Sequence, residues 1–107
     1  MSNRNRDSGH KYELKVLKKL KHLFPQIVTS RNESRSQDAK KVDFCFTGPF
    51  NFQVKLSMTK PSYDIIEDMP EGVNVMIHGQ VKKSNKNFVL KEEYAIIKLD
   101  EFIKLIE

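Results

Sequence analysis

The chain has 107 residues, the length of one ordinary domain, which excludes a second independently folded unit of usual size. It is 38% apolar and 31% charged, with apolar residues in periodic blocks, so we expect a folded core. No apolar run reaches the roughly 18–20 residues that cross a bilayer, and the first residues lack a secretory signal. The single cysteine excludes an internal disulfide framework and a cysteine-based zinc cage. We therefore expect a cytoplasmic protein without a membrane partner.

The formal charge of +5 is unevenly distributed along the chain. Residues 1–60 hold thirteen of the nineteen Lys and Arg residues but only five of the fourteen Asp and Glu residues. A basic half indicates a polyanionic partner, most often nucleic acid and otherwise an anionic lipid surface. The alternative is a basic surface that only meets solvent.

The first part of the chain predicts an arm followed by a helix. Residues 1–7 are polar, and we expect a flexible N-terminal arm ahead of a single domain over residues 8–107. Apolar residues at helical spacing predict a helix over Lys11–Phe24, capped by Asp7 or Ser8 and ended by the following proline.

Three strands and a polar loop are predicted next. Gln26–Arg31 reads as a strand and Asn32–Lys41 as a loop. Val42–Phe46 and Phe52–Ser57 both alternate between apolar and polar residues around a short turn, which predicts a β-hairpin. If the apolar residues of both strands share the core face, Asp43, Gln53 and Lys55 share the polar face.

The remaining chain predicts a short helix at Pro61–Asp68, a buried strand at Val73–Ile77 and a polar turn at Gln80–Asn87. Two further strands are predicted at Phe88–Leu90 and Tyr94–Leu99. A last helix, capped by Asp100, is expected to place Phe102, Ile103 and Ile106 inward. The resulting order, α-β-β-β-α-β-β-α, is that of a mixed α/β domain with a central β-sheet flanked by helices.

Four polar residues interrupt the apolar patterns and carry the candidate chemistry. Glu13 lies in or beside the apolar stripe of the first helix, and Asp43 lies inside a strand. Gln53 and Lys55 share one strand face. Carboxylate and amide oxygens are ligands for Mg²⁺, and a lysine beside them can neutralise charge on a phosphodiester. The alternatives are a favourable helix-dipole position for Glu13 and a half-exposed sheet face for Asp43.

The order of a helix Glu, a strand Asp and then Gln-x-Lys resembles the PD-(D/E)XK nuclease superfamily. Within it, the chain is similar to small archaeal-type and phage Holliday junction resolvases. The resemblance runs through SGHKYELKVLKKL, TSRNESRSQDAKKVDF and FNFQVKLS to the final YAIIKLDEFIKLIE. It implies a restriction-endonuclease-like fold and, if the source is viral, action in the host cytoplasm during DNA recombination.

The resemblance also implies an active site. Glu13, Asp43 and Gln53, with the Val54 carbonyl, would hold Mg²⁺, with Mn²⁺ as a possible substitute, and Lys55 would stabilise the transition state. Gln53 departs from the usual acidic residue and removes one negative charge. Asp38 is a rival for the Asp role, but it lies in a polar loop and we prefer Asp43.

Basic and hydroxyl side chains near this site fit phosphate contacts. A serine of the resembled resolvases acts near the scissile phosphate, and Ser34 or Ser36 could occupy that place; the sequence does not choose between them. The expected DNA-binding residues are Lys11, Lys15, Lys18, Arg31, Arg35, Lys40 and Lys41.

We therefore expect a Mg²⁺-dependent DNA endonuclease that hydrolyses phosphodiesters at branched DNA. Two symmetric cuts require two sites, so we expect a homodimer. With four glycines and no glycine-rich phosphate loop, no nucleotide cofactor is expected. The alternatives are a non-catalytic nucleic-acid-binding module on the same fold and a nuclease for other DNA substrates.

Overall fold

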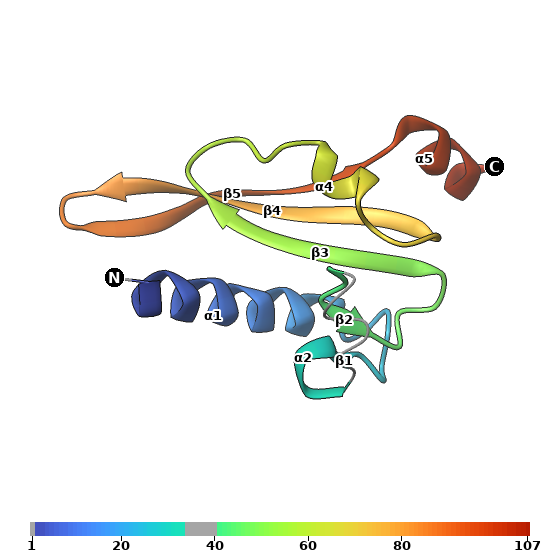
Figure 1. Cartoon of the computed structure of the whole chain (residues 1–107), viewed down its shortest axis with the longest axis horizontal. Helices are drawn as coiled ribbons and strands as arrows, with labels where there is room; N and C mark the ends of the chain where they lie inside the picture. The colour runs from blue at the N-terminus through green and yellow to red at the C-terminus, as the bar shows by residue number, and fades with distance from the viewer. Residues whose placement is uncertain (1, 34–40) are drawn as a thin grey trace.

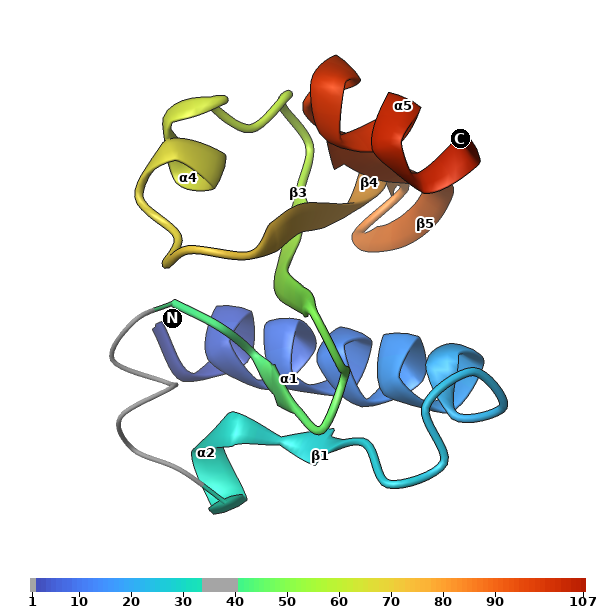
Figure 2. The same ribbon diagram turned by 90° about the vertical axis from the view of Figure 1, so that its right-hand side faces the viewer.

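A computed structural model describes residues 2–33 and 41–107 of the chain. The elements are arranged as a three-stranded sheet with a long helix on one face, a short helix on the other and the last helix at one end, next to a two-stranded sheet (Figures 1 and 2). This arrangement confirms the predicted mixed α/β class and a sheet flanked by helices. The predicted element order is also found, with two differences. A short helix, α2, is added, and the predicted strands Phe88–Leu90 and Tyr94–Leu99 form one strand, Asn87–Ile97. Within the described residues, no helix is long and apolar enough to cross a membrane.

The long helix α1, Ser2–Leu20, lies under the main sheet. It begins earlier than the predicted cap, so residues 2–7 form its first turns, and it ends before Phe24. Tyr12 and Val16 lie one turn apart and are buried in the core, which also contains Phe52 and Val75 from the sheet. The predicted apolar face therefore packs against the sheet.

The main sheet contains β3 (Phe50–Ser57), β4 (Val73–Ser84) and β5 (Asn87–Ile97) in that order. β3 pairs with β4 in parallel, and β4 pairs with β5 in antiparallel orientation. The parallel pairing needs a crossover, which contains the short helix α4, Asp64–Glu67. Side-chain alternation places Phe52 and Val54 on the α1 face, and Gln53 and Lys55 on the opposite face.

A second, smaller sheet replaces the hairpin predicted for residues 42–57. β2 (Phe44–Cys45) pairs with β1 (Val28–Thr29), and β3 pairs with β4, so the predicted ladder between the two alternating runs is wrong. The four-residue helix α2, Ser30–Glu33, follows β1 directly, where the sequence predicts the end of a strand and the start of a loop.

The apolar alternation around β2 is only partly correct. Val42 and Phe44 are buried as predicted, but Phe46 is 57% exposed. Phe46 has φ 65, a left-handed backbone conformation that turns the chain between β2 and β3 and breaks the strand alternation.

The β4–β5 hairpin is longer than the sequence predicts. The supposed polar turn at Gln80–Asn87 is mostly paired strand, and the chain reverses at Asn85 and Lys86, with Asn85 at φ 55. Most residues beyond Val81 are exposed, so this arm has no apolar alternation for a sequence pattern to detect.

The last helix, α5, Leu99–Ile106, contains no buried residue. The prediction that Phe102, Ile103 and Ile106 point inward is wrong, because these side chains are 47%, 42% and 67% exposed. The helix follows the end of β5 and lies at the end of the sheet rather than under it (Figure 1). Its apolar residues therefore belong to the surface.

A polar contact fastens α1 to β5. The Tyr12 hydroxyl donates to Glu93 Oε2 at 2.8 Å, and Lys19 Nζ binds Glu93 Oε1. The hydrogen bond from Lys19 lowers the pKa of Glu93 below its ordinary value, and the bond from Tyr12 contributes in the same direction. Burial raises the pKa of the Tyr12 phenol, as does its bond to Glu93.

We expect Glu93→Gln to lower the free energy of unfolding by about 1 kcal/mol at pH 7. Because the folded-state pKa of Glu93 is lowered, its contribution is present above the ordinary pKa and is lost as the pH falls through the folded-state value. Urea unfolding at pH 7 and below pH 4 measures this difference. Glu92→Gln is the matched control on the same strand, and an equal loss in both variants would contradict the assignment.

The Tyr12 ring also leaves no room for a side chain at Gly79. A Cβ added at Gly79 would lie 2.4 Å from Tyr12 Cζ, and the ring cannot move away without leaving Glu93. We expect Gly79→Ala to destabilise the protein by about 2 kcal/mol, as overpacking does. Gly9→Ala is the control, since its added Cβ meets nothing within 4 Å and should slightly favour α1. Equal urea midpoints for wild type and Gly79→Ala would contradict this packing.

Candidate active site

Asp43 joins the small sheet to the outer edge of β3. Its backbone N–H donates to the Phe52 carbonyl at 2.7 Å, and its carboxylate Oδ2 accepts from the Val54 N–H at 2.6 Å. Its own carbonyl accepts from the Ser30 N–H at 2.9 Å. The carboxylate is therefore held at a fixed place beside the strand that carries Gln53 and Lys55.

The Val54 carbonyl lies at the same edge of β3. The N–H and C=O of one strand residue point to the same side, and the Val54 N–H points to Asp43. An acidic oxygen and a backbone carbonyl thus lie at one point of the strand edge. Both are oxygen ligands of the kind that Mg²⁺ accepts.

Gln53 is a buried amide with an unsatisfied oxygen. Its side chain is 8% exposed, and Oε1 has no hydrogen-bond partner within the described part of the chain. A buried polar atom without a partner costs about 1–3 kcal/mol, so such an atom requires an explanation. A bound cation or a water molecule at this oxygen would provide one.

Lys55 is exposed two residues further along β3 and lies on the same strand face as Gln53. Its position next to the edge that binds Asp43 leaves its ammonium group available to a phosphate that approaches from solvent. Asp43 itself lies at the strand edge and is not paired with Gln53 and Lys55 in a hairpin. Its carboxylate binds the backbone of β3 between these two residues.

Glu13 is buried at 6% exposure and forms an ion pair with Arg31, with 3.6 Å between Glu13 Oε2 and an Arg31 guanidinium nitrogen. Arg31 follows Ser30, whose N–H binds the Asp43 carbonyl. Glu13 is thereby connected to the Asp43 region through α2. From the sequence, Arg31 was predicted only to bind DNA phosphates. The spacing of Glu13 and Arg31 along the chain does not predict their ion pair.

Two hydroxyl residues at the junction of β1 and α2 were not among the predicted catalytic residues. Thr29 and Ser30 are 3% and 0% exposed, and neither hydroxyl oxygen has a hydrogen-bond partner among the described residues. Together with Gln53 Oε1, they make three unsatisfied buried oxygens in segments that contact Asp43 or flank its contacts. A Thr-Ser pair is common in protein sequences, so the sequence alone does not indicate that these two hydroxyl groups are buried.

The donor set fits a magnesium ion in its chemistry. Asp43, the Val54 carbonyl and Gln53 Oε1 are oxygen donors, and Glu13 lies next to the same region. No group of three His, Cys, Asp or Glu side chains within residues 8–31 and 41–107 is arranged to hold a metal, so the set contains only two acids. The observation that favours an added cation is the Gln53 oxygen, which has no partner among the residues that the structure describes.

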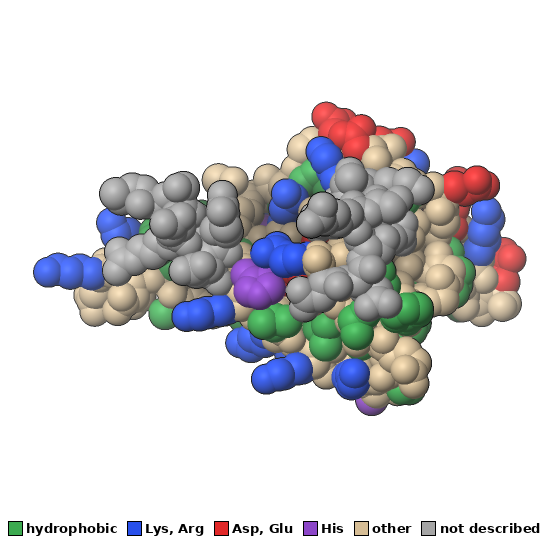
Figure 3. Space-filling model, turned by 60° about the horizontal axis from the view of Figure 1, so that its bottom comes forward, with side chains coloured by type: hydrophobic (Ala, Val, Ile, Leu, Met, Phe, Trp, Pro, Cys, Tyr) green, Lys and Arg blue, Asp and Glu red, His purple; other side chains and the backbone are tan. Residues whose placement is uncertain are grey.

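Most of the predicted DNA-binding residues that the structure describes are surface groups. Lys11, Lys15, Lys18, Arg31 and Lys41 are exposed. Figure 3 shows many Lys and Arg side chains over the face that carries α1, whereas Asp and Glu gather at the other end of the molecule. Ser34, Ser36, Arg35, Asp38 and Lys40 lie outside the described residues.

Two further residues with reactive side chains, Cys45 and His78, are both buried. Cys45 is buried in β2 and is unsuited to act as an accessible nucleophile. His78 is 3% exposed, its Nε2 atom lies 2.9 Å from the Ser57 hydroxyl oxygen, and its ring stacks on Tyr94.

Comparisons with protein-family models, curated proteins and solved structures find no match for this chain.

Proposed function

We propose that the chain is a metal-dependent DNA endonuclease that hydrolyses phosphodiester bonds, with branched DNA such as a four-way junction as its substrate. The observation that carries this proposal is on β3, where the Val54 N–H binds the Asp43 carboxylate at the strand edge and the preceding residue, Gln53, has a buried oxygen without a partner among the described residues. Lys55 is exposed on the same strand face as Gln53. The exposed basic residues on α1 and α2 provide charge for a polyanionic substrate.

Each residue has a distinct task in this proposal. Mg²⁺ bound by Asp43, Gln53 and the Val54 carbonyl, with Glu13 nearby, would lower the pKa of a bound water and neutralise phosphate charge. The Val54 N–H orients the Asp43 carboxylate. The exposed Lys55 neutralises charge that develops on the phosphate. Lys11, Lys15 and Lys18, together with Arg31, hold the sugar–phosphate backbone by charge.

Side-by-side cleavage tests the proposal. Four-way, flap and linear duplex DNA are incubated with the purified chain in Mg²⁺, Mn²⁺ or EDTA. We expect nicking only with a divalent metal and fastest on the four-way junction. Equal cleavage of linear duplex DNA would support nuclease activity but contradict selectivity for branched DNA. The absence of cleavage with either metal would contradict the proposal that the chain is an enzyme.

Two observations favour a second function. Gln53 stands where an acidic residue would strengthen metal binding, and Glu13 is already paired with Arg31. We propose a non-catalytic nucleic-acid-binding module as the alternative. Salt-sensitive binding of branched DNA without any nicking in Mg²⁺ or Mn²⁺ would support this alternative.

We also propose that the chain acts as a homodimer, because paired cuts in a symmetric junction need two sites. The exposed apolar side chains of α5, among them Phe102 and Ile103, provide a surface for association. Ile66 and Met69 from the α4 region are buried within the single chain and do not contribute to such a surface. Sedimentation equilibrium should give twice the chain mass, and the mass of one chain would contradict the dimer.

A further inference from the structure

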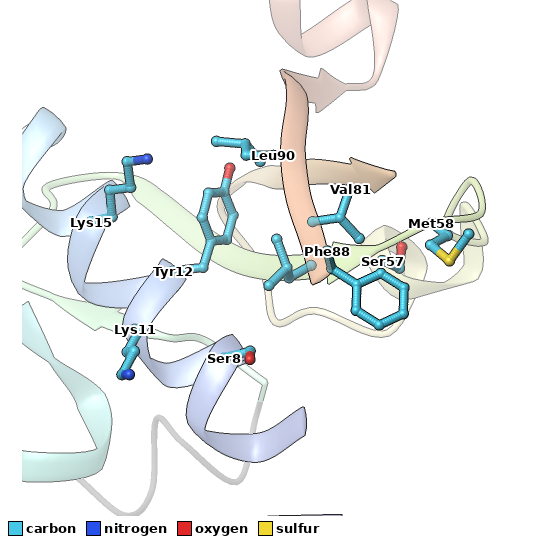
Figure 4. A pocket seen from close by; sticks show the side chains of 10 residues that line it. Ser8, Lys11, Tyr12, Lys15, Ser57, Met58, Val81, Phe88 and Leu90 are labelled. Atoms are coloured by element: carbon cyan, nitrogen blue, oxygen red, sulfur yellow. The ribbon is translucent and has the colours of Figure 1, made fainter. Parts of the chain in front are cut away.

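A groove separates the N-terminal half of α1 from the β4–β5 arm (Figure 4). Its volume is about 550 Å³, within the roughly 300–1,000 Å³ usual for ligand pockets. Ser8, Lys11, Tyr12 and Lys15 line one side, at the i, i+3, i+4 and i+7 positions of one helix face. Leu56, Ser57 and Met58 lie at the end of β3, and Val81, Phe88 and Leu90 lie on the arm.

The groove combines an apolar floor with a basic rim. Phe88 is 60% exposed, and Met58 and Leu90 are also exposed, although large apolar side chains usually pack inside a domain. Lys11 and Lys15 stand on the helix side, and none of the described lining residues is acidic. Cross-strand pairing puts Lys83 directly opposite Phe88 on the same face of the arm, and Lys82 and Lys86 lie close to the tip.

This combination matches unpaired nucleotides better than a duplex. An aromatic ring accepts the face of a base, and lysines on both sides accept phosphates, whereas the base faces of duplex DNA are already stacked. A peptide or lipid chain could use the apolar floor, but the two-sided lysine rim is complementary to a polyanion. The lysines therefore indicate a nucleic-acid strand as the occupant.

The groove lies on the α1 face of the sheet, close to the strand edge that binds Asp43. Leu56 lines the groove two residues beyond Val54 and on the same face, and the Val54 N–H binds the Asp43 carboxylate. We propose that this groove binds a single-stranded DNA segment, with one base stacked on Phe88 and the flanking phosphates on Lys11, Lys15 and Lys83. The choice of DNA as the strand rests on the proposed function. A substrate with unpaired nucleotides next to the scissile phosphate would then occupy both regions.

Fluorescence anisotropy with labelled oligothymidylate and a duplex of equal length, both in EDTA, tests the proposal. We expect oligothymidylate to bind more tightly than the duplex, and Phe88→Ala to weaken that binding about tenfold. Combined Lys15→Ala and Lys83→Ala should reduce the slope of log affinity against log salt by about 1.4. Tyr63→Ala and Lys60→Ala, at exposed positions outside the groove, are the matched controls and should change neither quantity.

Three results would overturn the proposal. They are unchanged oligothymidylate binding by Phe88→Ala, equal affinity for single strand and duplex, and binding to anionic phospholipid vesicles without binding to oligothymidylate. Unfolding midpoints of each variant confirm that it folds, and Phe88→Tyr, which keeps a stacking ring, should retain binding. This experiment measures binding and not cleavage, so a failed nuclease assay does not affect its result. Conversely, nicking of DNA without oligothymidylate binding would contradict the groove proposal and leave the proposed function intact.

Discussion

Asp43→Asn should reduce metal-dependent nicking of branched DNA by about a thousandfold. A bound metal supplies several kcal/mol of transition-state stabilisation, and each 1.36 kcal/mol is a factor of ten in rate. Asparagine keeps an oxygen that can accept the Val54 N–H bond, so the edge of β3 should stay intact while the negative charge is removed. The measurement is the initial nicking rate of a labelled four-way junction in Mg²⁺.

The matched control for this substitution is Asp64→Asn, the same chemical change on the exposed start of α4. It should leave the nicking rate unchanged. A wild-type rate in Asp43→Asn would exclude Asp43 as the principal metal ligand, and an equal loss in both variants would indicate a general effect of charge. Urea unfolding of both proteins separates a lost ligand from a lost fold.

Gln53→Glu should produce opposite effects with and without metal. Without metal, a carboxylate at this 8% exposed position lies near Asp43 and is costly to bury, so we expect about 3 kcal/mol of destabilisation. With Mg²⁺, the added charge should strengthen metal binding and restore much of that loss, because a ligand that binds only the folded state stabilises it. Urea midpoints measured in EDTA and in Mg²⁺ at about a thousand times its dissociation constant, where binding adds about 4 kcal/mol, provide the comparison.

Gln80→Glu is the control for the Gln53 variant. Gln80 is a half-buried glutamine on β4, so the same change of charge is made elsewhere on the main sheet. Its midpoint should respond to Mg²⁺ no more than that of wild type. If Mg²⁺ stabilises neither variant, the unsatisfied Gln53 oxygen is not part of a metal site.

The buried alternating residues were the most predictable part of this fold. Val42, Phe44 and Phe52 are buried as their spacing predicts, since a strand that packs one face on a core must alternate. The partner of each strand was less predictable. β3 pairs with β4 across a long crossover, and alternation describes a strand's faces but not the strand beside it.

The candidate site was predictable in its residue types more than in its contacts. Asp43 and Lys55 interrupt apolar runs and could be selected by pattern alone. The Asp43 carboxylate bond to the Val54 N–H depends on how two sheets meet, and the pairing of Glu13 with Arg31 depends on where α2 lies against α1. Neither contact follows from spacing along the chain.

The two bonds between Asp43 and β3 also affect how the molecule opens. They connect the small sheet to the main sheet at the residue proposed to hold the metal. Local opening of the small sheet would expose the Asp43 and Val54 amides together, and any ligand that binds the closed form suppresses such opening. Hydrogen exchange at these two amides would therefore slow together as metal is added, so that occupancy of the site can be read from the backbone without any substrate.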